Sequence, residues 1–345
     1  MYLEAVKKKK PPLLQFSSRG IYCAVADVYL DPWRPVPKAL ITHGHADHAR
    51  WGHGQYICTE ASLPILKHRL GNIQLSGRPY GDRFLVNGVQ FSFHPAGHVL
   101  GSAQIRVEYQ GEVWVFTGDY KLENDGVSTP FEPIRCHTFI SECTFGLPVF
   151  DWQNPTEIHS QINHWWAAQN SDKRSAVLMG YSLGKAQRLL KHLDPNIGPI
   201  YTHSSITAMT EVTSAQVDFP KTLALNKEVD KNDLKGALIL APPAAAGGAW
   251  MKKLSNPSTG YASGWMSFRG ARRRRGFDRG FVLSDHADWK GLLKAIKATG
   301  CEKVITTHGY THLFAQYLRE QGYDAITEKT AFEAETPAEE TSTTL

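Results

Sequence analysis

The sequence predicts an α/β fold with two β-sheets covered by helices. Short apolar strands alternate with helical segments from both ends of the chain, which is typical of layered sheets and helices. Polar residues follow several of these strands, most densely in residues 42–50. The 345 residues, of which 42% are hydrophobic and 21% charged, match an ordinary globular protein with about two domains.

Charge and cysteine content narrow the expected partners. The net charge is +5, but the last fifteen residues carry four glutamates and no basic residue, so the rest carries +9. A basic body favours a polyanionic partner. Residues 1–14 lack the apolar core of a signal peptide and no stretch resembles a membrane span, so we expect a cytoplasmic protein without a membrane partner. Five cysteines without paired spacing are typical of reduced thiols.

The first expected elements lead to a candidate acid. The lysines of residues 7–10 are expected to form a solvated arm. Residues 21–28 and 28–30 are expected to form a strand pair that ends at Asp31. Because Asp31 precedes the histidine-rich stretch, it is a candidate for an acid that orients a metal ligand. Asp27 is a rival for this role, and an aspartate that merely stabilises a turn is the other alternative.

The stretch at residues 42–50 has the spacing of a two-metal site. It contains three histidines and an aspartate within six positions: His43, His45, Asp47 and His48. After the apolar strand of residues 39–41, the first two histidines point the same way and can bind one ion. The aspartate is expected to begin a helix, which directs it and the last histidine to a second point nearby. The alternatives are an exposed polar loop and a structural zinc site, which favours cysteine ligands.

Two hairpins supply further candidate ligands. Residues 84–99 are expected to form the first, as a strand, a turn at Asn87 and Gly88 and a second strand, followed by a loop over residues 94–98 that would hold His98 rigidly as a ligand. His94 lies on the strand and is expected to pack or to form hydrogen bonds. The second hairpin, over residues 103–116, leads to Asp119 at a sheet edge. There the carboxylate can bridge two cations, although an aspartate that caps a turn is the alternative.

The middle of the chain has a different character. The strand of residues 137–141 ends at Glu142, and a helix is expected over residues 158–168. The strand of residues 176–179 is followed by a glycine turn and a helix that reaches Leu193. Lys185, at the start of that helix, is a candidate for contact with a backbone phosphate, although a solvent-facing lysine fits equally well.

The last third contains a basic run and two more histidines. After the strand of residues 237–240 come four adjacent arginines: Arg272, Arg273, Arg274 and Arg275. Such a run is usually a solvated loop, but it precedes His286 and could bind phosphate at the mouth of a site. A helix over residues 290–298 and a strand over residues 302–306 lead to His308. The tail from residue 330 is acidic and is expected to be disordered.

The residues after the strands form two ligand sets with Asp119 in common. The first set consists of His43, His45, His98 and Asp119, and the second of Asp47, His48, Asp119 and His308. All ligands are nitrogen or oxygen, which suits Zn²⁺, Mn²⁺ or Fe without distinguishing them. Two neighbouring divalent ions suit phosphodiester hydrolysis.

The motifs HGHADHA, the His98 loop, TGDY and the final THG resemble the metallo-β-lactamase superfamily. Glu142, His286 in SDHAD and His308 resemble three further motifs of its β-CASP nucleases. The resemblance implies an αββα metallo-β-lactamase sandwich built from residues 1–146 and 276–329. Residues 147–275 would be an inserted β-CASP cap domain, and residues 330–345 a disordered acidic tail.

The resemblance also implies a mechanism and a substrate. His286 would be the general acid, held by Glu142, and Asp47 would take part in catalysis as well as in binding Zn or Mn. The runs VYLDPWRP, GYSLGKAQ and SDHADW are similar to those of bacterial ligase-associated DNA exonucleases. This implies a DNA exonuclease in repair, for which a DNA ligase or helicase is a candidate partner that the sequence leaves open.

One motif favours RNA. In the family, histidine at the last motif is typical of the RNA-processing branch, and His308 occupies that position, so an RNA-processing nuclease is the alternative. A small-molecule hydrolase would share the first four motifs but would not need Glu142 or His286. A pseudo-nuclease scaffold would lack ligands, and none is missing from the sequence.

Overall fold

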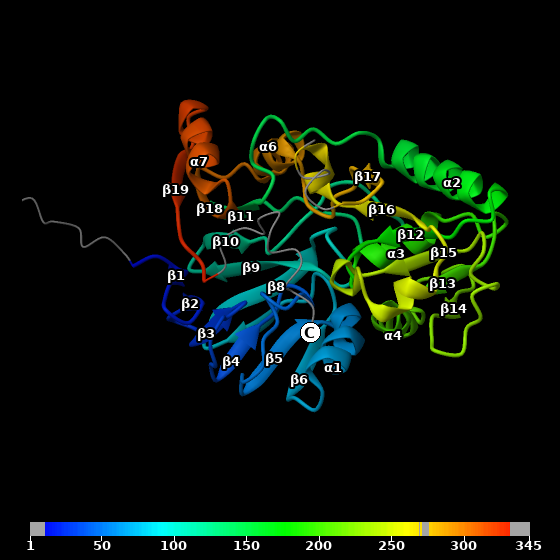
Figure 1. The fold of residues 1–345 in the computed structure, drawn as a ribbon. Coiled ribbons are helices and arrows are strands. Elements are labelled where there is room, and N and C mark those ends of the chain that lie inside the picture. The colour runs from blue at the N-terminus through cyan, green and yellow to red at the C-terminus, as the bar shows by residue number, and fades with distance from the viewer. Residues whose placement is uncertain (1–10, 269, 271–275, 332–345) are drawn as a thin grey trace, which may run out of the picture.

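The computed structural model describes residues 11–268, 270 and 276–331, and their strands form three sheets (Figure 1). The expected α/β class is confirmed. The basic run at residues 272–275, the lysines at residues 7–10 and most of the acidic tail lie outside the described residues. In the described part of the chain, no helix combines the length and apolar character needed to cross a bilayer.

The first sheet follows the order of the sequence. Its strands are β1 (Gln15–Phe16), β2 (Ile21–Cys23), β3 (Val28–Leu30), β4 (Lys38–Leu40), β5 (Gln55–Thr59) and β6 (Leu75–Arg78). The first three strands pair antiparallel, and the pairs from β3 to β6 are parallel. Helix α1 (Leu63–Leu70) covers the outer face, where Leu66 and Leu70 pack in one cluster with Ile41 and Tyr56.

The second sheet combines both ends of the chain. Its order is β19 (Asp324–Thr327), β18 (Lys303–Gly309), β11 (Thr138–Cys143), β10 (Glu112–Phe116), β9 (Ala103–Tyr109), β8 (Val89–Pro95) and β7 (Phe84–Val86). Alternate residues of β10 face opposite layers because successive side chains of a strand point to opposite faces. Trp114 and Phe116 pack with the first sheet, whereas Val113 and Val115 pack with α6 (Trp289–Thr299) and α7 (Thr311–Glu320). The result is a helix, sheet, sheet, helix arrangement.

The third sheet lies beside these layers (Figure 1). Its order is β14 (Leu223–Ala224), β13 (Ile200–Thr202), β15 (Leu238–Ala241), β12 (Ala176–Met179), β16 (Ser258–Ala262) and β17 (Arg279–Phe281), and its strand pairs are parallel. Helices α2 (Pro155–Ser171), α3 (Lys185–His192) and α4 (Ser204–Thr213) contribute to the core on one face. The continuous apolar runs in β12 and β15 follow from burial of both faces.

Several expected elements differ from the structure. The sequence predicted two sheets, and the third is formed by residues that were expected to belong mostly to the inserted segment. Residues 24–27 form a turn rather than a continuation of the strand from residue 21. The expected helix at Asp47 is wrong, because residues 46–48 form only a turn. The predicted second part of the metallo domain begins at residue 276, whereas β17 pairs with β16 in the third sheet.

A buried histidine between α2 and α3 predicts a pH dependence of stability. His159 stacks on His192 with ring centroids 4.1 Å apart, and burial lowers the pKa of His159 to about 3. The unfolded chain binds this proton near pH 6.5, so stability is complete above that pH and is lost as the pH falls towards 3. We expect His159 to account for about 2 kcal/mol of lost stability between pH 7 and pH 5.

Urea unfolding at the two pH values measures this loss. His159→Gln should reduce the difference between pH 7 and pH 5, because glutamine does not titrate. His164→Gln, on the exposed side of the same helix, should leave the wild-type difference intact. Equal pH dependence in wild type and His159→Gln would contradict the prediction.

Candidate metal centre

The candidate ligands lie where strands of the two facing sheets end. The histidine-rich stretch follows β4, His98 follows β8 and Asp119 follows β10. His308 lies on β18, with a left-handed backbone (φ 48°). The next residue must be glycine, because a Cβ at Gly309 would lie 2.2 Å from the carbonyl oxygen of Cys143. Close contact between β18 and β11 therefore sets the position of His308.

The structure brings the first predicted ligand set together. Ligand atoms of His43, His45, His98 and Asp119 all lie within 4.8 Å of one another, and we call these four residues the Asp119 cluster. Asp119 Oδ2 is 3.5 Å from His43 Nε2 and 3.7 Å from His98 Nε2. His45 Nδ1 is 3.1 Å from His98 Nε2. Such a group of four nitrogen and oxygen donors can hold one divalent ion.

The second set is linked to the first through Asp119. His48 Nε2 lies 3.4 Å from Asp119 Oδ2 and 3.4 Å from Asp47 Oδ2. The His308 ring stacks on His48 with centroids 5.7 Å apart, while its Nε2 lies 3.3 Å from Thr330 Oγ1. One carboxylate oxygen of Asp119 thus lies close to ligand nitrogens of both sets, as a bridging ligand requires.

Asp31 and Thr42 orient the histidines of this stretch. Asp31 Oδ2 lies 2.7 Å from His48 Nδ1, and Asp31 Oδ1 accepts the backbone N–H of Thr42 at 2.8 Å. Thr42 Oγ1 lies 3.0 Å from His43 Nδ1. These contacts leave Nε2 of both histidines directed at the cluster. Asp27 lies instead at an exposed turn, where it accepts a hydrogen bond from Tyr22, so it does not take the orienting role.

The donor set fits a metal ion. Among the described residues, His43 Nε2 and His48 Nε2 are buried and make no hydrogen bond, with carboxylate oxygens 3.4 to 3.5 Å away, which is costly unless another group satisfies these nitrogens. Burial lowers the pKa of His43, His45 and His98, so neutral imidazoles with a free lone pair are favoured.

The pKa of His48 is shifted in the opposite direction to those of the three histidines of the Asp119 cluster. Burial disfavours its charge, but the surrounding carboxylates of Asp119, Asp47 and Asp31 hold the pKa of His48 well above its ordinary value. The carboxylates therefore favour a positive charge at this point, which a bound cation would also supply. The ligand types suit Zn²⁺ or Mn²⁺.

His286 and Glu142 form a pair beside the cluster. His286 Nδ1 lies 2.8 Å from Glu142 Oε1, and the other carboxylate oxygen accepts the backbone N–H of Thr144 at 3.1 Å. Glu142 lies within β11, not after it as the sequence predicted, and is buried. Ligand atoms of Asp119, Glu142 and His286 lie within 4.8 Å of one another. The pair is therefore within reach of a group bound at the cluster.

Lys185 differs from both predicted roles. Its Nζ donates to the carbonyl oxygen of Leu283 at 2.7 Å and lies 3.0 Å from Asp285 Oδ2, and the side chain is buried. It is therefore not exposed to solvent. His94 behaves as expected: its Nε2 lies 3.0 Å from Ser92 Oγ on β8.

The sequence did not indicate that Thr42 contacts a ligand histidine. It also did not indicate that the backbone carbonyls of Leu183 and Asp285 do so. The carbonyl oxygen of Leu183 lies 3.2 Å from His45 Nε2, and that of Asp285 lies 2.7 Å from His98 Nδ1. A backbone carbonyl carries no signal in residue type. The position of Asp285 beside His286 in SDHAD was the available signal for that residue.

Comparison with known proteins gives relatives but no matching family model. The chain is 30% identical over 313 residues to a probable DNA ligase of Opitutus terrae, covering 89% of this chain but 30% of that protein. It is 24% identical over 221 residues to an RNase J-like protein of Methanocaldococcus jannaschii, covering 54% of this chain and 52% of the relative. The chain therefore spans 30% of the length of the first relative and 52% of the length of the second.

Two further comparisons concern RNA cleavage and the fold. The chain is 36% identical over 118 residues to endoribonuclease YSH1 of Candida glabrata, covering 32% of this chain and 14% of the relative. A crystal structure of a protein of unknown function from Enterococcus faecalis is similar to this chain with a TM-score of 0.58 and 13% sequence identity. The match covers 86% of this chain and 79% of that protein chain. At this identity the similarity supports the fold alone. Beside these similarities to other proteins, the Asp119 cluster of this chain could hold a metal ion.

Proposed function

We propose that this protein is a metal-dependent DNA exonuclease that hydrolyses phosphodiester bonds in DNA repair. The observation that carries the proposal is the position of Asp119. Its Oδ2 lies 3.4 to 3.7 Å from nitrogens of His43, His48 and His98, and its carboxylate also lies beside the pair of His286 and Glu142. This geometry supports a centre for two cations beside a proton donor.

We assign the residues the following roles in this proposal. The Asp119 cluster would hold one divalent ion, Zn or Mn, and Asp47, His48, Asp119 and His308 the other. Ions at such a centre neutralise developing charge on phosphate and lower the pKa of water. Glu142 accepts the Nδ1–H of His286, so Nε2 is the atom that delivers a proton to the leaving oxygen. Asp47 would support catalysis through its contact with His48.

The third sheet and its helices would form the inserted β-CASP cap, expected over residues 147–275. Substrate would lie between this cap and the metal centre. Arg272, Arg273, Arg274 and Arg275 would bind backbone phosphates near the site, since guanidinium groups contact phosphate without reading sequence. Lys185 has no such role in this proposal, because its side chain is buried.

DNA is favoured over RNA because the relative named as a probable DNA ligase matches 89% of this chain. A ligase, or a helicase, would then act on the same DNA. The second candidate is an RNA-processing nuclease, which the RNase J-like and YSH1 relatives and the histidine at position 308 favour.

End-labelled single-stranded DNA and RNA of matched sequence separate the two candidates. With Mn²⁺ or Zn²⁺ present, we expect DNA to be shortened stepwise from one end and RNA to be degraded more slowly. An Asp119→Ala chain controls for contaminating nucleases. Faster cleavage of RNA would favour the second candidate, and cleavage at internal positions would contradict exonuclease action.

The basic run should contribute to affinity in a salt-dependent way. Replacing the four arginines with glutamine should weaken binding of single-stranded DNA, because each arginine bound to a phosphate releases condensed counterions. The slope of log K against log salt should become shallower by about 0.7 for each phosphate that is no longer neutralised. Fluorescence anisotropy at several salt concentrations measures this slope. An unchanged slope would mean that the run does not contact DNA.

A further inference from the structure

The turn before α3 reaches the metal centre from the third sheet. The carbonyl oxygen of Leu183 lies 3.2 Å from His45 Nε2. The next residue, Gly184, has a φ of 89°, and a Cβ there would lie 2.3 Å from Val99 Cγ1. Only glycine allows this approach. The turn is therefore packed directly against the loops that carry His45 and His98.

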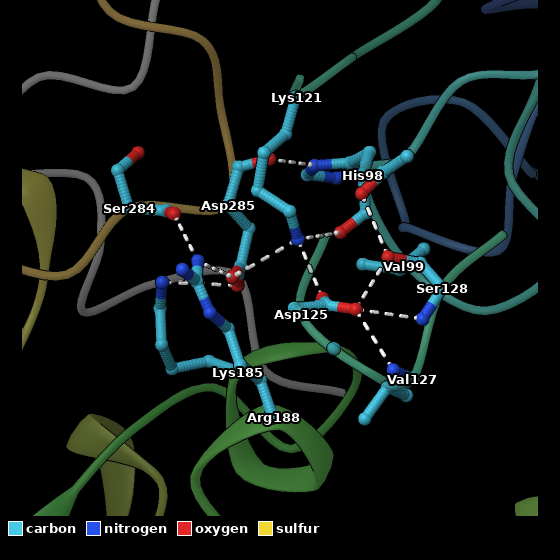
Figure 2. Close-up of polar contacts among 12 residues, drawn as sticks. His98, Val99, Lys121, Asp125, Val127, Ser128, Lys185, Arg188, Ser284 and Asp285 are labelled. Carbon is cyan, nitrogen blue, oxygen red and sulfur yellow. Dashed lines mark hydrogen bonds and ion pairs between the residues drawn. The ribbon is translucent and has the colours of Figure 1, made fainter. Parts of the chain in front are cut away.

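Helix α3 also holds the segment that contacts His98 (Figure 2). Lys185 Nζ donates to the carbonyl oxygen of Leu283 at 2.7 Å and lies 3.0 Å from Asp285 Oδ2. One turn further on, Arg188 Nη1 donates to the carbonyl oxygen of Ser284 and lies 3.2 Å from Asp285 Oδ1. Residues three apart on a helix share a face, so both cations bind the same segment.

A third cation joins the same network from the second sheet (Figure 2). Lys121 Nζ lies 2.6 Å from Asp125 Oδ2 and 4.0 Å from Asp285 Oδ1, and it donates to the carbonyl oxygen of His98 at 3.2 Å. Asp125 is fixed in turn by the backbone N–H of Ser128 at 2.8 Å. His98 is thus contacted at both its ring and its backbone by groups of one network.

The network is buried, which makes it a poor source of stability. The side chains of Lys121, Lys185 and Asp285 are no more than 9% exposed. Burial alone would raise the pKa of Asp285, but the neighbouring cations hold it well below its usual range. Because burying ion pairs costs desolvation, such a network is often no more stabilising than apolar packing. Its geometry points to a role in positioning.

The two carbonyl contacts determine which nitrogen of each imidazole faces the cluster. The Nε2–H of His45 donates to Leu183, which leaves Nδ1 free, and this atom lies 3.1 Å from His98 Nε2. The Nδ1–H of His98 donates to Asp285, which leaves Nε2 free beside Asp119. A metal-bound histidine commonly donates its other N–H to a carbonyl or carboxylate, which fixes the tautomer and the ring.

We propose that Lys185 and Arg188 of α3, acting through Asp285, and the carbonyl of Leu183 are positioning groups for the metal ligands His98 and His45. This rests on the proposed function only in requiring an ion at the Asp119 cluster. Metal affinity then depends on how α3 packs against the loops that carry His45 and His98. The third sheet is part of the metal centre in this sense, although it supplies no ligand of the cluster.

Binding of Co²⁺ alone to the full chain tests the proposal, with affinity and the visible absorption spectrum as readouts. Lys185→Met should weaken binding about 10- to 100-fold and alter the spectrum, because the carbonyl that orients His98 is released. Lys185→Arg should restore part of the affinity, since it keeps the charge. The matched control is Leu190→Ala on the same helix, which faces the apolar core of the third sheet. It should lower the unfolding temperature and leave Co²⁺ affinity unchanged.

The outcomes separate positioning from general destabilisation. If Lys185→Met does not fold, the charge-balanced Lys185→Met/Asp285→Asn chain replaces it, with the same expected loss. Wild-type affinity in the folded variant, or equal losses in that variant and Leu190→Ala, would overturn the proposal. A wild-type chain that binds no Co²⁺ would instead remove the proposed function, and this inference with it.

Discussion

Replacing Asp119 with alanine is expected to abolish hydrolysis and to remove bound metal from both ligand sets. Its Oδ2 lies 3.5 Å from His43 Nε2 and 3.4 Å from His48 Nε2, so one carboxylate serves both sets. Without it, the buried imidazoles lose the negative charge that offsets a cation. His48→Ala should remove the metal of the second set and abolish hydrolysis as well, because both ions are needed. Metal content per chain and the rate of DNA hydrolysis measure these effects.

A matched control comes from another aspartate. Asp27 lies at an exposed turn with a left-handed backbone (φ 53°), a conformation that asparagine tolerates. Asp27→Asn should keep wild-type metal content and activity, whereas Asp119→Asn should lose both. An active Asp119→Ala chain with unchanged metal content would contradict the two-metal assignment.

Replacing His286 with alanine should slow the chemical step and leave both the metal content and DNA binding unchanged. A departing alkoxide needs a proton, and a positioned acid contributes about 10² to 10⁴-fold, or roughly 3 to 5 kcal/mol. Single-turnover rates with DNA should fall by about this factor. Glu142→Gln should cause a smaller loss, because it weakens the contact with His286 Nδ1 at 2.8 Å without removing the imidazole. The double variant should lose less than the sum of the two.

The leaving group separates acid catalysis from a structural role. On a phosphodiester with a nitrophenolate leaving group, protonation is dispensable, so His286→Ala should approach the wild-type rate. His164→Ala, an exposed histidine of α2, should match wild type on both substrates. An equal defect of His286→Ala on both substrates, or loss of metal, would show that His286 is a ligand or a support instead.

Local patterns predicted much of the fold. Both hairpins of the second sheet were predicted, because alternating apolar residues and the turn residues Asn87, Gly88 and Gly111 specify them locally. The helix predicted at Asp47 is replaced by a single turn, for a physical reason. The N–H of Ala49 bonds to the carbonyl oxygen of His45 at 2.8 Å, but Gly52, with a φ of 97°, lies just beyond this single turn.

Side-chain chemistry predicted the ligand residues of the candidate site better than the groups that orient those ligands. Spacing and strand ends identified the four residues of the Asp119 cluster, because such donors are rarely gathered without a purpose. The sequence around Lys185 resembles a phosphate-binding turn and does not indicate that tertiary packing buries this lysine against Asp285. The carbonyl of Leu183 contacts His45, 138 positions away in the sequence, and the carbonyl of Asp285 contacts His98, 187 positions away. The two histidines are themselves 53 positions apart. Such contacts exist only after folding.

The most direct test of the central claim is metal titration of activity. Protein freed of metal by a chelator is titrated with Mn²⁺, while bound metal and cleavage of end-labelled DNA are measured together. We predict no cleavage without metal, and cleavage that rises with binding until two ions are bound per chain. Cleavage at the full rate without bound metal, or saturation of binding without any cleavage of DNA or RNA, would contradict a metal-dependent nuclease.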